Sequence, residues 1–246
     1  MNSSRYIIGF TAVLTAFVAL ILSLLYTGLK EKHRQNELLF EKRAILASIQ
    51  HVLGKDVAKM SDKEIMEIFD KKIKQLVINT KGEIVSKEEV EKAGYKGGKA
   101  ENIIIKKEMK KDFDKRLLPL YIYDAGNGKK IYILKLFGKG LWDEISGYIA
   151  LDSDKNTVVG VSFDHKGETP GMGAEMKDNP KFKEQFIGKT IFDENGNLVG
   201  ITLRKGGAID KKHEVDAITG ATLTSNGITE MIKNSLKNYE AFLKKK

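Results

Sequence analysis

The sequence has 246 residues, with 42 Lys and Arg against 33 Asp and Glu, so its formal net charge is +9. Hydrophobic residues make up 41% and charged residues 30%, which excludes a wholly disordered chain and allows one anchored domain or two small ones. The absence of cysteine excludes disulfides, thiolate metal sites and cysteine nucleophiles, so any chemistry must use oxygen, nitrogen or a bound cofactor.

The positive charge is concentrated at the two ends of the chain. Residues 1–29, 30–60 and 231–246 carry +1, +3 and +4, which leaves only +1 for residues 61–230. A nucleic-acid surface needs a basic stripe on a folded domain. The middle of the chain has no such excess, so we expect no nucleic-acid partner.

The first element is an apolar segment, residues 6–29, that contains no charged side chain. Its 24 residues, at about 1.5 Å each, would span roughly 36 Å, more than the ~30 Å core of a bilayer. A cleaved signal peptide is the alternative, but the apolar run is too long and no small-x-small cleavage site follows it. We therefore expect residues 1–29 to form a transmembrane anchor.

The charges beside this anchor bear on its orientation. Arg5 and the α-amino group precede it, whereas five basic residues follow it: Lys30, Lys32, Arg34, Lys42 and Arg43. By the positive-inside rule, this asymmetry places the large domain in the cytoplasm.

Residues 31–53 carry apolar side chains in heptad-spaced rows, which indicate an amphipathic helix continuing from the anchor. The rows are Leu38/Ile45/Val52 and Leu39/Leu46/Leu53, with Ile49 between them. We expect residues 30–60 to form a membrane-proximal stalk or a helix laid on the domain. Its basic start suits contact with membrane lipid headgroups, although a solvated helix face is the simpler interpretation.

The extramembrane part begins with short elements over residues 61–115. Ser61 and Glu64 form a capping-box pattern ahead of apolar residues at helical spacing, which predicts a short helix. A hairpin is predicted next, with arms at 75–79 and 83–85.

Residues 116–246 are dominated by strand signals and end in a helix. Paired runs predict three antiparallel hairpins, at 118–123 with 130–137, 147–151 with 157–163, and 190–193 with 198–204. Apolar residues then recur at helical spacing: Ile228, Met231, Ile232, Leu236, Tyr239, Phe242 and Leu243. The expected class is α+β: a single N-terminal transmembrane helix, then a mixed domain with antiparallel hairpins and a C-terminal helix.

Two loops depart from what folding alone requires. Residues 167–173 read GETPGMG, a tight loop that would hold the Glu168 carboxylate, the Thr169 hydroxyl and several N–H groups near a ligand, although an ordinary turn has the same composition. Residues 204–208 read RKGGA, which suits a phosphate or an electron-rich ring but is also a common strand exit.

A third segment, residues 216–225, reads DAITGATLTS directly before the C-terminal helix. Unpaired N–H groups and the positive end of the helix dipole make such a helix N-terminus an anion-binding site. Thr222, Thr224 and Ser225 are alternatively simple N-cap residues. Three hydroxyls with Gly220 and an upstream acid nevertheless exceed what one cap needs.

Other chemistries lack support in the sequence. The four histidines have no metal-ligand spacing, and neither a dinucleotide-binding motif, nor a P-loop, nor a nucleophile elbow occurs. We therefore do not expect a stand-alone enzyme or a metal site.

The segment 216–222, Asp-Ala-Ile-Thr-Gly-Ala-Thr, resembles the flavinylation motif Asp-x-x-Ser/Thr-Gly-Ala-Thr of domains that carry FMN through a phosphoester bond to the last threonine. With the anchor, the 140–152 segment and the GETPGMG loop, essentially the whole chain resembles the NqrC family, the C subunits of the Na⁺-translocating NADH:quinone reductase. The G subunit of the Rnf ferredoxin:NAD⁺ complex shares the motif, but the chain length favours the reductase. Met172 and Thr219 replace the usual Leu and Ser while keeping apolar bulk and a hydroxyl.

The resemblance implies that Thr222 carries covalent FMN, that Asp216 belongs to the recognition site of the flavin transferase that attaches it, and that Lys205 lies near the ring or phosphate. The full set of residues implied to bind the flavin is Trp142, Glu168, Thr169, Gly171, Met172, Gly173, Lys205, Asp216, Thr219, Gly220, Ala221, Thr222, Leu223 and Thr224.

The resemblance also implies an electron carrier in a bacterial inner-membrane complex of six subunits, with the other five (A, B, D, E and F) as partners. That complex passes electrons from NADH toward quinone and exports Na⁺. It implies a periplasmic domain, against the charge rule, which a helix held by partner subunits need not obey. A membrane-anchored binding module without a redox group is the rival interpretation.

Overall fold

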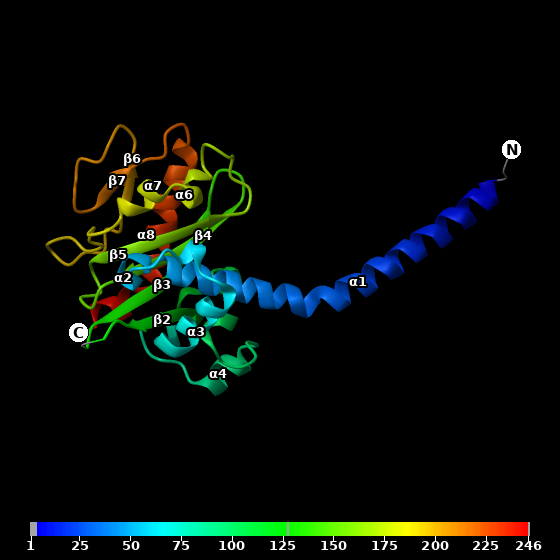
Figure 1. Ribbon diagram of the computed structural model, residues 1–246, viewed down its shortest axis with the longest axis horizontal. Helices are drawn as coiled ribbons and strands as arrows, with labels where there is room; N and C mark the ends of the chain where they lie inside the picture. The colour runs from blue at the N-terminus through cyan, green and yellow to red at the C-terminus, as the bar shows by residue number, and fades with distance from the viewer. Residues whose placement is uncertain (1–3, 127, 246) are drawn as a thin grey trace. The chain divides into compact units, whose positions relative to one another are not determined.

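The computed structural model describes residues 4–126 and 128–245. It divides into two compact units, the first ending at Phe40 and the second starting at Glu41, and each is described by itself. Figure 1 traces the chain from its N-terminal to its C-terminal helix.

The first unit is the N-terminal part of α1 (Ser4–Ala47), a helix of 44 residues. The side chains of its apolar segment are exposed. In the described part of the chain, α1 is the one helix long and apolar enough, by length and composition, to span a membrane. The predicted amphipathic segment begins within the same uninterrupted helix.

The amphipathic segment breaks earlier than its apolar rows indicate. α1 ends at Ala47, and α2 (Gln50–Leu53) is a separate short helix. Between them the Ser48 hydroxyl donates to the carbonyl three residues earlier at 2.6 Å, which competes with continued helix. The Ser48 carbonyl also lies against Gly160 of the sheet, where a Cβ would come within 2.3 Å. The single helix predicted here is therefore interrupted by its packing on the domain.

The second unit is built on a five-stranded antiparallel sheet. Its strands are β1 (Ile73–Asn79), β2 (Leu117–Asp124), β3 (Lys130–Lys139), β4 (Glu144–Leu151) and β5 (Val158–His165). Each strand pairs with the next one along the chain, so the sheet is a meander. The first two hairpins predicted for the second half of the chain and the α+β class are confirmed.

Successive side chains of a strand point to opposite faces of the sheet, and both faces carry buried apolar residues. Leu120 and Leu134 belong to the apolar core shared with α8 (Thr222–Lys244), the predicted C-terminal helix, which lies along the sheet in Figure 1. On the other face, the Tyr121 and Tyr148 rings pack edge to face with their centroids 6.0 Å apart. The first turns of α8 therefore lie beside the connection between β3 and β4, where Gly227 approaches the Lys139 carbonyl oxygen.

Short helices fill the connections. They are η1 (Val57–Lys59), α3 (Asp62–Lys72), α4 (Lys87–Lys92), η2 (Ala100–Asn102), α5 (Ile105–Glu108), η3 (Phe113–Lys115), α6 (Glu175–Asp178) and α7 (Pro180–Glu184). The predicted capping box starts α3, where the Glu64 carboxylate accepts from the Ser61 N–H at 2.9 Å. The hairpin predicted after β1 is a tight turn with one bridge, between Ile78 and Ile84.

The prediction that 198–204 forms one arm of a third antiparallel hairpin is wrong beyond its turn. Phe192 and Leu198 form a single bridge, after which Gly200 takes φ +69° and redirects the chain. The strands that follow, which pair in parallel, are β6 (Thr202–Arg204) and β7 (Glu214–Asp216). Glycine reaches this left-handed conformation more easily than residues with a side chain, and alternating hydrophobicity does not reveal it.

Candidate functional site

Three segments that are far apart in the sequence meet at the Glu168 side chain, which is 4% exposed. Its Oε2 accepts a hydrogen bond from the Thr224 hydroxyl at 2.5 Å, and its Oε1 accepts one from the Trp142 N–H at 3.1 Å. Within residues 4–126 and 128–245, no cationic side chain forms an ion pair with it. One buried carboxylate therefore joins the 167–173 loop, the exit of β3 and the first turn of α8.

Glycines make this close packing possible. A Cβ at Gly140 would come within 2.3 Å of Glu168 Oε1, and a Cβ at Gly173 within 2.5 Å of Glu168 Oε2. On α8, a Cβ at Gly227 would come within 2.5 Å of the Lys139 carbonyl oxygen. These glycines let backbone approach a carboxylate and a crossing strand, which an ordinary turn does not require.

Most of the 167–173 loop faces solvent, whereas Gly173 is buried beside Glu168. Thr169 is exposed, and its carbonyl accepts from the Met172 and Ala174 N–H groups at 3.1 and 3.2 Å. Gly171 takes φ +71° within this turn. The loop therefore exposes Thr169 and Met172 while it buries Glu168.

The first turn of α8 has no side-chain cap. Its N-cap residue is Ala221, whose side chain makes no capping bond. Thr224 is engaged by Glu168. The Ser225 hydroxyl accepts instead from the Ile218 N–H at 3.0 Å, which ties the preceding loop to the helix. The alternative in which these hydroxyls are simple N-caps is therefore wrong, because Ala221 is the N-cap residue and other contacts engage Thr224 and Ser225.

Thr222 is the first residue of α8, and its side chain is exposed. Among the described residues, none bonds to its hydroxyl, and none accepts from the N–H groups of Thr222, Leu223 or Thr224. The neighbouring Thr219 and Gly220 are also exposed, with Gly220 at φ +76°. The uncapped end of a 23-residue helix thus lies beside a free hydroxyl, an arrangement suited to an anionic ester.

Exposed apolar side chains lie on the same three segments. Trp142 is 66% exposed and Leu223 is 59% exposed, and Leu141 and Met172 are exposed as well. Large exposed apolar groups gathered in one place mark a surface for a ligand or a partner.

Trp142 also lines an open groove of about 470 Å³. The groove is lined by Lys106, Met109, Lys110, Phe137, Gly138, Lys139, Trp142, Asp143 and Glu144. Sequence reasoning missed Met109 and Phe137, because no local pattern shows that the connection after α5 lies beside the end of β3. Hydrogen bonds from Lys106 and Lys166 lower the pKa of Glu144 at the edge of this groove.

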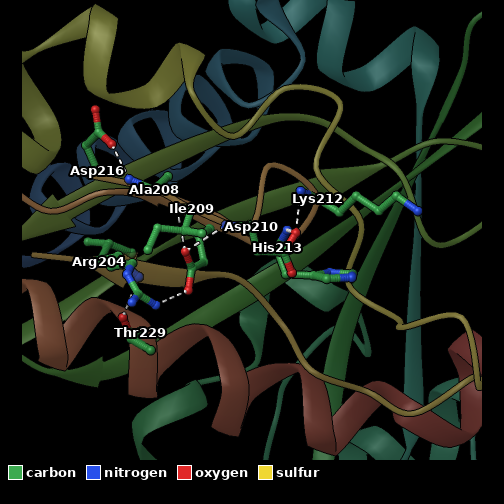
Figure 2. Close-up of polar contacts among 10 residues, drawn as sticks. Arg204, Ala208, Ile209, Asp210, Lys212, His213, Asp216 and Thr229 are labelled. Carbon is green, nitrogen blue, oxygen red and sulfur yellow. Dashed lines mark hydrogen bonds and ion pairs between the residues drawn. The ribbon is translucent and has the colours of Figure 1, made fainter. Parts of the chain in front are cut away.

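Asp216 lies at the end of the parallel pair β6 and β7. The strand register pairs Arg204 with Asp216, and the Ala217 N–H donates to the Arg204 carbonyl at 3.0 Å. Asp216 Oδ1 accepts from the Ala208 N–H at 2.8 Å (Figure 2). Lys205 is exposed, and no hydrogen bond or ion pair joins it to any described residue.

Glu214 fastens the rest of the loop between β6 and β7. Its Oε2 accepts from the Ile209 and Asp210 N–H groups at 2.8 and 3.0 Å. Its Oε1 accepts from Arg204 Nη1 at 2.9 Å. The bonds from Asp210 and Ile209 are the main causes that lower the pKa of Glu214. Figure 2 shows Asp210 in turn accepting from the Lys212 N–H, so this loop is built by backbone-to-carboxylate bonds.

The predicted site residues therefore fall into two clusters. Trp142, Glu168, Gly173 and Thr224 are in direct contact. Asp216 belongs to the β6–β7 cluster, and the Ile218–Ser225 bond links that cluster to α8. In the described part of the chain, no group of three or more His, Asp and Glu side chains is arranged to hold a metal ion.

Comparisons with known proteins bear directly on this arrangement. Residues 140–237 match the FMN-binding domain family. Over 95% of this chain and 94% of the relative, the sequence is 32% identical to the C subunit of Na⁺-translocating NADH-quinone reductase from Pseudomonas aeruginosa. The chain belongs to the NqrC family, the C subunits of this reductase. The relative from Vibrio vulnificus is likewise 32% identical, over 92% of this chain and 88% of the relative.

Solved structures from the NqrC family have the same fold. The crystal structure of the C subunit from Parabacteroides distasonis is 34% identical, with a TM-score of 0.74 over 89% of this chain and 98% of that one. NqrC from Shewanella oneidensis is 28% identical, with a TM-score of 0.63 over 82% of this chain and 96% of that one. Both clusters of this NqrC family member, from Trp142 to Thr224, lie inside the segment that matches the FMN-binding domain.

Proposed function

We propose that this chain is an electron-carrying flavoprotein subunit that holds FMN on Thr222 through its phosphate. The observation that carries the proposal is the exposed, unbonded Thr222 hydroxyl at the uncapped start of α8, in the last position of the DAITGAT motif. The match of residues 140–237 to the FMN-binding domain supports the choice of cofactor.

The residues present fit a phosphate at this position. An ester of FMN with Thr222 keeps one negative charge, and the N–H groups of Thr222, Leu223 and Thr224 have no acceptor among the described residues. The positive end of α8 stabilises such a charge by about 0.3–1 kcal/mol. The nearest buried anion, Glu168, already accepts two hydrogen bonds, which spread its charge.

Attachment needs a flavin transferase and a flavin dinucleotide as donor. The Thr222 oxygen forms the new P–O bond, its proton passes to a base of the transferase, and the donor's phosphoanhydride bond breaks to release a nucleoside monophosphate. No oxidant or reductant is consumed. The exposed position of Thr222 allows the transferase to reach it.

The exposed apolar side chains fit the flavin ring. Trp142, Met172 and Leu223 lie on the segments joined at Glu168, and the groove beside Trp142 has room for a planar ring system. Lys205 supplies a positive charge that favours reduced, anionic flavin. When bound, FMN supplies one- and two-electron transfer; the chain orients it and prevents its dissociation.

Within the complex, we propose that the chain relays electrons from NADH toward quinone, coupled to Na⁺ export, together with the other five subunits (A, B, D, E and F). The names of the relatives support this complex over the Rnf complex. We further propose a transmembrane anchor at 1–29, a membrane-proximal segment at 30–60, and an FMN-binding domain at 116–246 that follows the 61–115 part and faces the periplasm.

The test is flavin fluorescence in the protein band of a denaturing gel after co-expression with a flavin transferase. We expect a fluorescent band for the wild type and none for Thr222→Val, with Thr202→Val, at an exposed threonine of β6, as the matched control. Full fluorescence in Thr222→Val would exclude this attachment site. A dark wild-type band would favour the rival, a binding module without a redox group.

A further inference from the structure

The 205–207 loop is closed on both sides by consecutive residues of the flavinylation motif. Before the loop, the Arg204 carbonyl accepts from the Ala217 N–H at 3.0 Å. After it, the Ala208 N–H donates to Asp216 Oδ1 at 2.8 Å (Figure 2). The side chain of Asp216 therefore supplies one of the two bonds that set where Lys205 lies.

The loop between these bonds needs such an anchor. Gly206 and Gly207 take φ +84° and +102°, conformations that glycine reaches easily but also leaves easily. A Cβ at Gly207 would lie 3.9 Å from Asp216 Oδ1, so the second glycine runs directly over the carboxylate. In the described part of the chain, no other hydrogen bond reaches residues 205–208, because the bonds to Glu214 begin at Ile209.

The same segment continues to the attachment residue. After Ala217, the Ile218 N–H donates to Ser225 Oγ at 3.0 Å, which joins the motif to the first turns of α8. A line of bonds thus runs from the 205–208 loop through Asp216 and Ile218 to the turn that starts at Thr222.

The backbone at Asp216 does not depend on its side chain. Its N–H donates to Gln185 Oε1 at 2.9 Å, and its strand pairs with β6. The side chain is exposed, so a substitution there removes the bond to Ala208 without opening the core. Asp216 Oδ2 has no bonded partner among the described residues, which leaves direct recognition by charge as the competing role.

We infer that Asp216 is a positioning residue: its Oδ1 holds the 205–208 loop beside the flavin-bearing turn, and the site needs this hydrogen-bond acceptor, not the negative charge. The inference rests on the proposed attachment of FMN to Thr222. In this inference Asp216 acts through a hydrogen bond within this chain. The competing role, direct recognition by the transferase, would need the charged carboxylate.

The experiment compares Asp216→Asn with Asp216→Ala in the full-length chain, co-expressed with a flavin transferase. Asparagine keeps an acceptor for the Ala208 N–H but has no charge, whereas alanine has neither. We expect Asp216→Asn to keep more than half of the wild-type flavin per protein and Asp216→Ala to lose at least about fivefold. Equal loss in both variants would overturn the inference in favour of charge recognition, and full retention in Asp216→Ala would overturn it outright.

A second variant removes the donor of the same hydrogen bond. Ala208→Pro removes the donor N–H and leaves the Asp216 carboxylate intact, so it should lose flavin as Asp216→Ala does. Full flavin in Ala208→Pro would contradict the inference. The matched control is Asp210→Ala, which breaks similar bonds in the far half of the loop and should keep its flavin. A dark wild-type band would instead reject the attachment of FMN itself.

Discussion

The Thr224 hydroxyl donates to Glu168 Oε2 at 2.5 Å, two residues along α8 from Thr222. Two residues turn an α-helix by about 200°, so a bond that draws Thr224 into the interior points Thr222 to the opposite side. The buried carboxylate thus sets which of two neighbouring threonines is available for esterification. This explains why Thr224 is 1% exposed while Thr222 is exposed.

Removal of the Glu168 carboxylate should destabilise this turn. Glu168→Ala leaves the Thr224 hydroxyl and the Trp142 N–H without their partner, at about 1–3 kcal/mol for the buried hydroxyl and less for the partly buried N–H. Glu168→Gln keeps an oxygen for Trp142 and an amide that can donate to Thr224, so it should retain most of the stability and flavin. Thermal unfolding of the full chain in detergent, with Glu184→Ala as an exposed control, measures this. An unchanged melting temperature in Glu168→Ala would contradict the role.

The glycines around the carboxylate give a matched pair of variants. A Cβ at Gly173 would come within 2.5 Å of Glu168 Oε2, whereas a Cβ at Gly167 in the same loop has its nearest neighbour at 3.7 Å. Gly173→Ala should cost about 1–3 kcal/mol by overpacking and should reduce flavin loading. Gly167→Ala should change both little. Equal effects of the two substitutions, measured by urea unfolding and in-gel fluorescence, would argue against steric control by the carboxylate.

Lys205 should tune the flavin through its charge. Replacing it in Lys205→Met removes an exposed cation, which should lower the flavin midpoint potential by about 20–40 mV, as expected for about 0.5–1 kcal/mol per electron. Redox titration of the loaded chain measures the shift. Lys211→Met, an exposed lysine in the far half of the same loop, is the control. A midpoint equal to the wild type in Lys205→Met would place the lysine away from the flavin.

Glu144 should contribute to acid sensitivity. Hydrogen bonds from Lys106 and Lys166 hold its pKa below the ordinary value of 4.5, so its ionised form stabilises the folded state. That contribution is complete above the unfolded-state pKa and is lost as the pH falls through the lower folded-state pKa. Glu144→Gln should therefore show a smaller drop in melting temperature than the wild type when the pH is lowered from about 6 to about 3. Parallel slopes for the two proteins would contradict this.

The positive-inside rule and the family resemblance predict opposite orientations of the domain, cytoplasmic and periplasmic respectively. In spheroplasts of cells that make the complete complex, external protease should digest the domain if it faces the periplasm. A protected domain, with a cytoplasmic control protein also intact, would support the orientation that the basic residues after the anchor indicate.

Much of the fold follows from patterns along the chain. The apolar 6–29 segment, the Ser61 capping box, the alternating strands of the meander and the apolar stripe of α8 each reflect a local periodicity of burial. The prediction failed at Gly200 and Ser48, where one backbone angle or one side-chain bond redirects the chain. These events depend on single residues and leave the hydrophobic period unchanged.

The sequence by itself determined the motif that ends at Thr222 and the helix that follows it. Only the tertiary structure decided that Glu168 joins Trp142, 26 residues away, to Thr224, 56 residues away, and that Asp216 binds the 205–208 loop. The physical reason is that a sequence motif specifies which chemical groups are present but not which distant residues they contact. Their contacts depend on strand register and on how closely α8 packs on β3, which Gly138 and Gly227 permit.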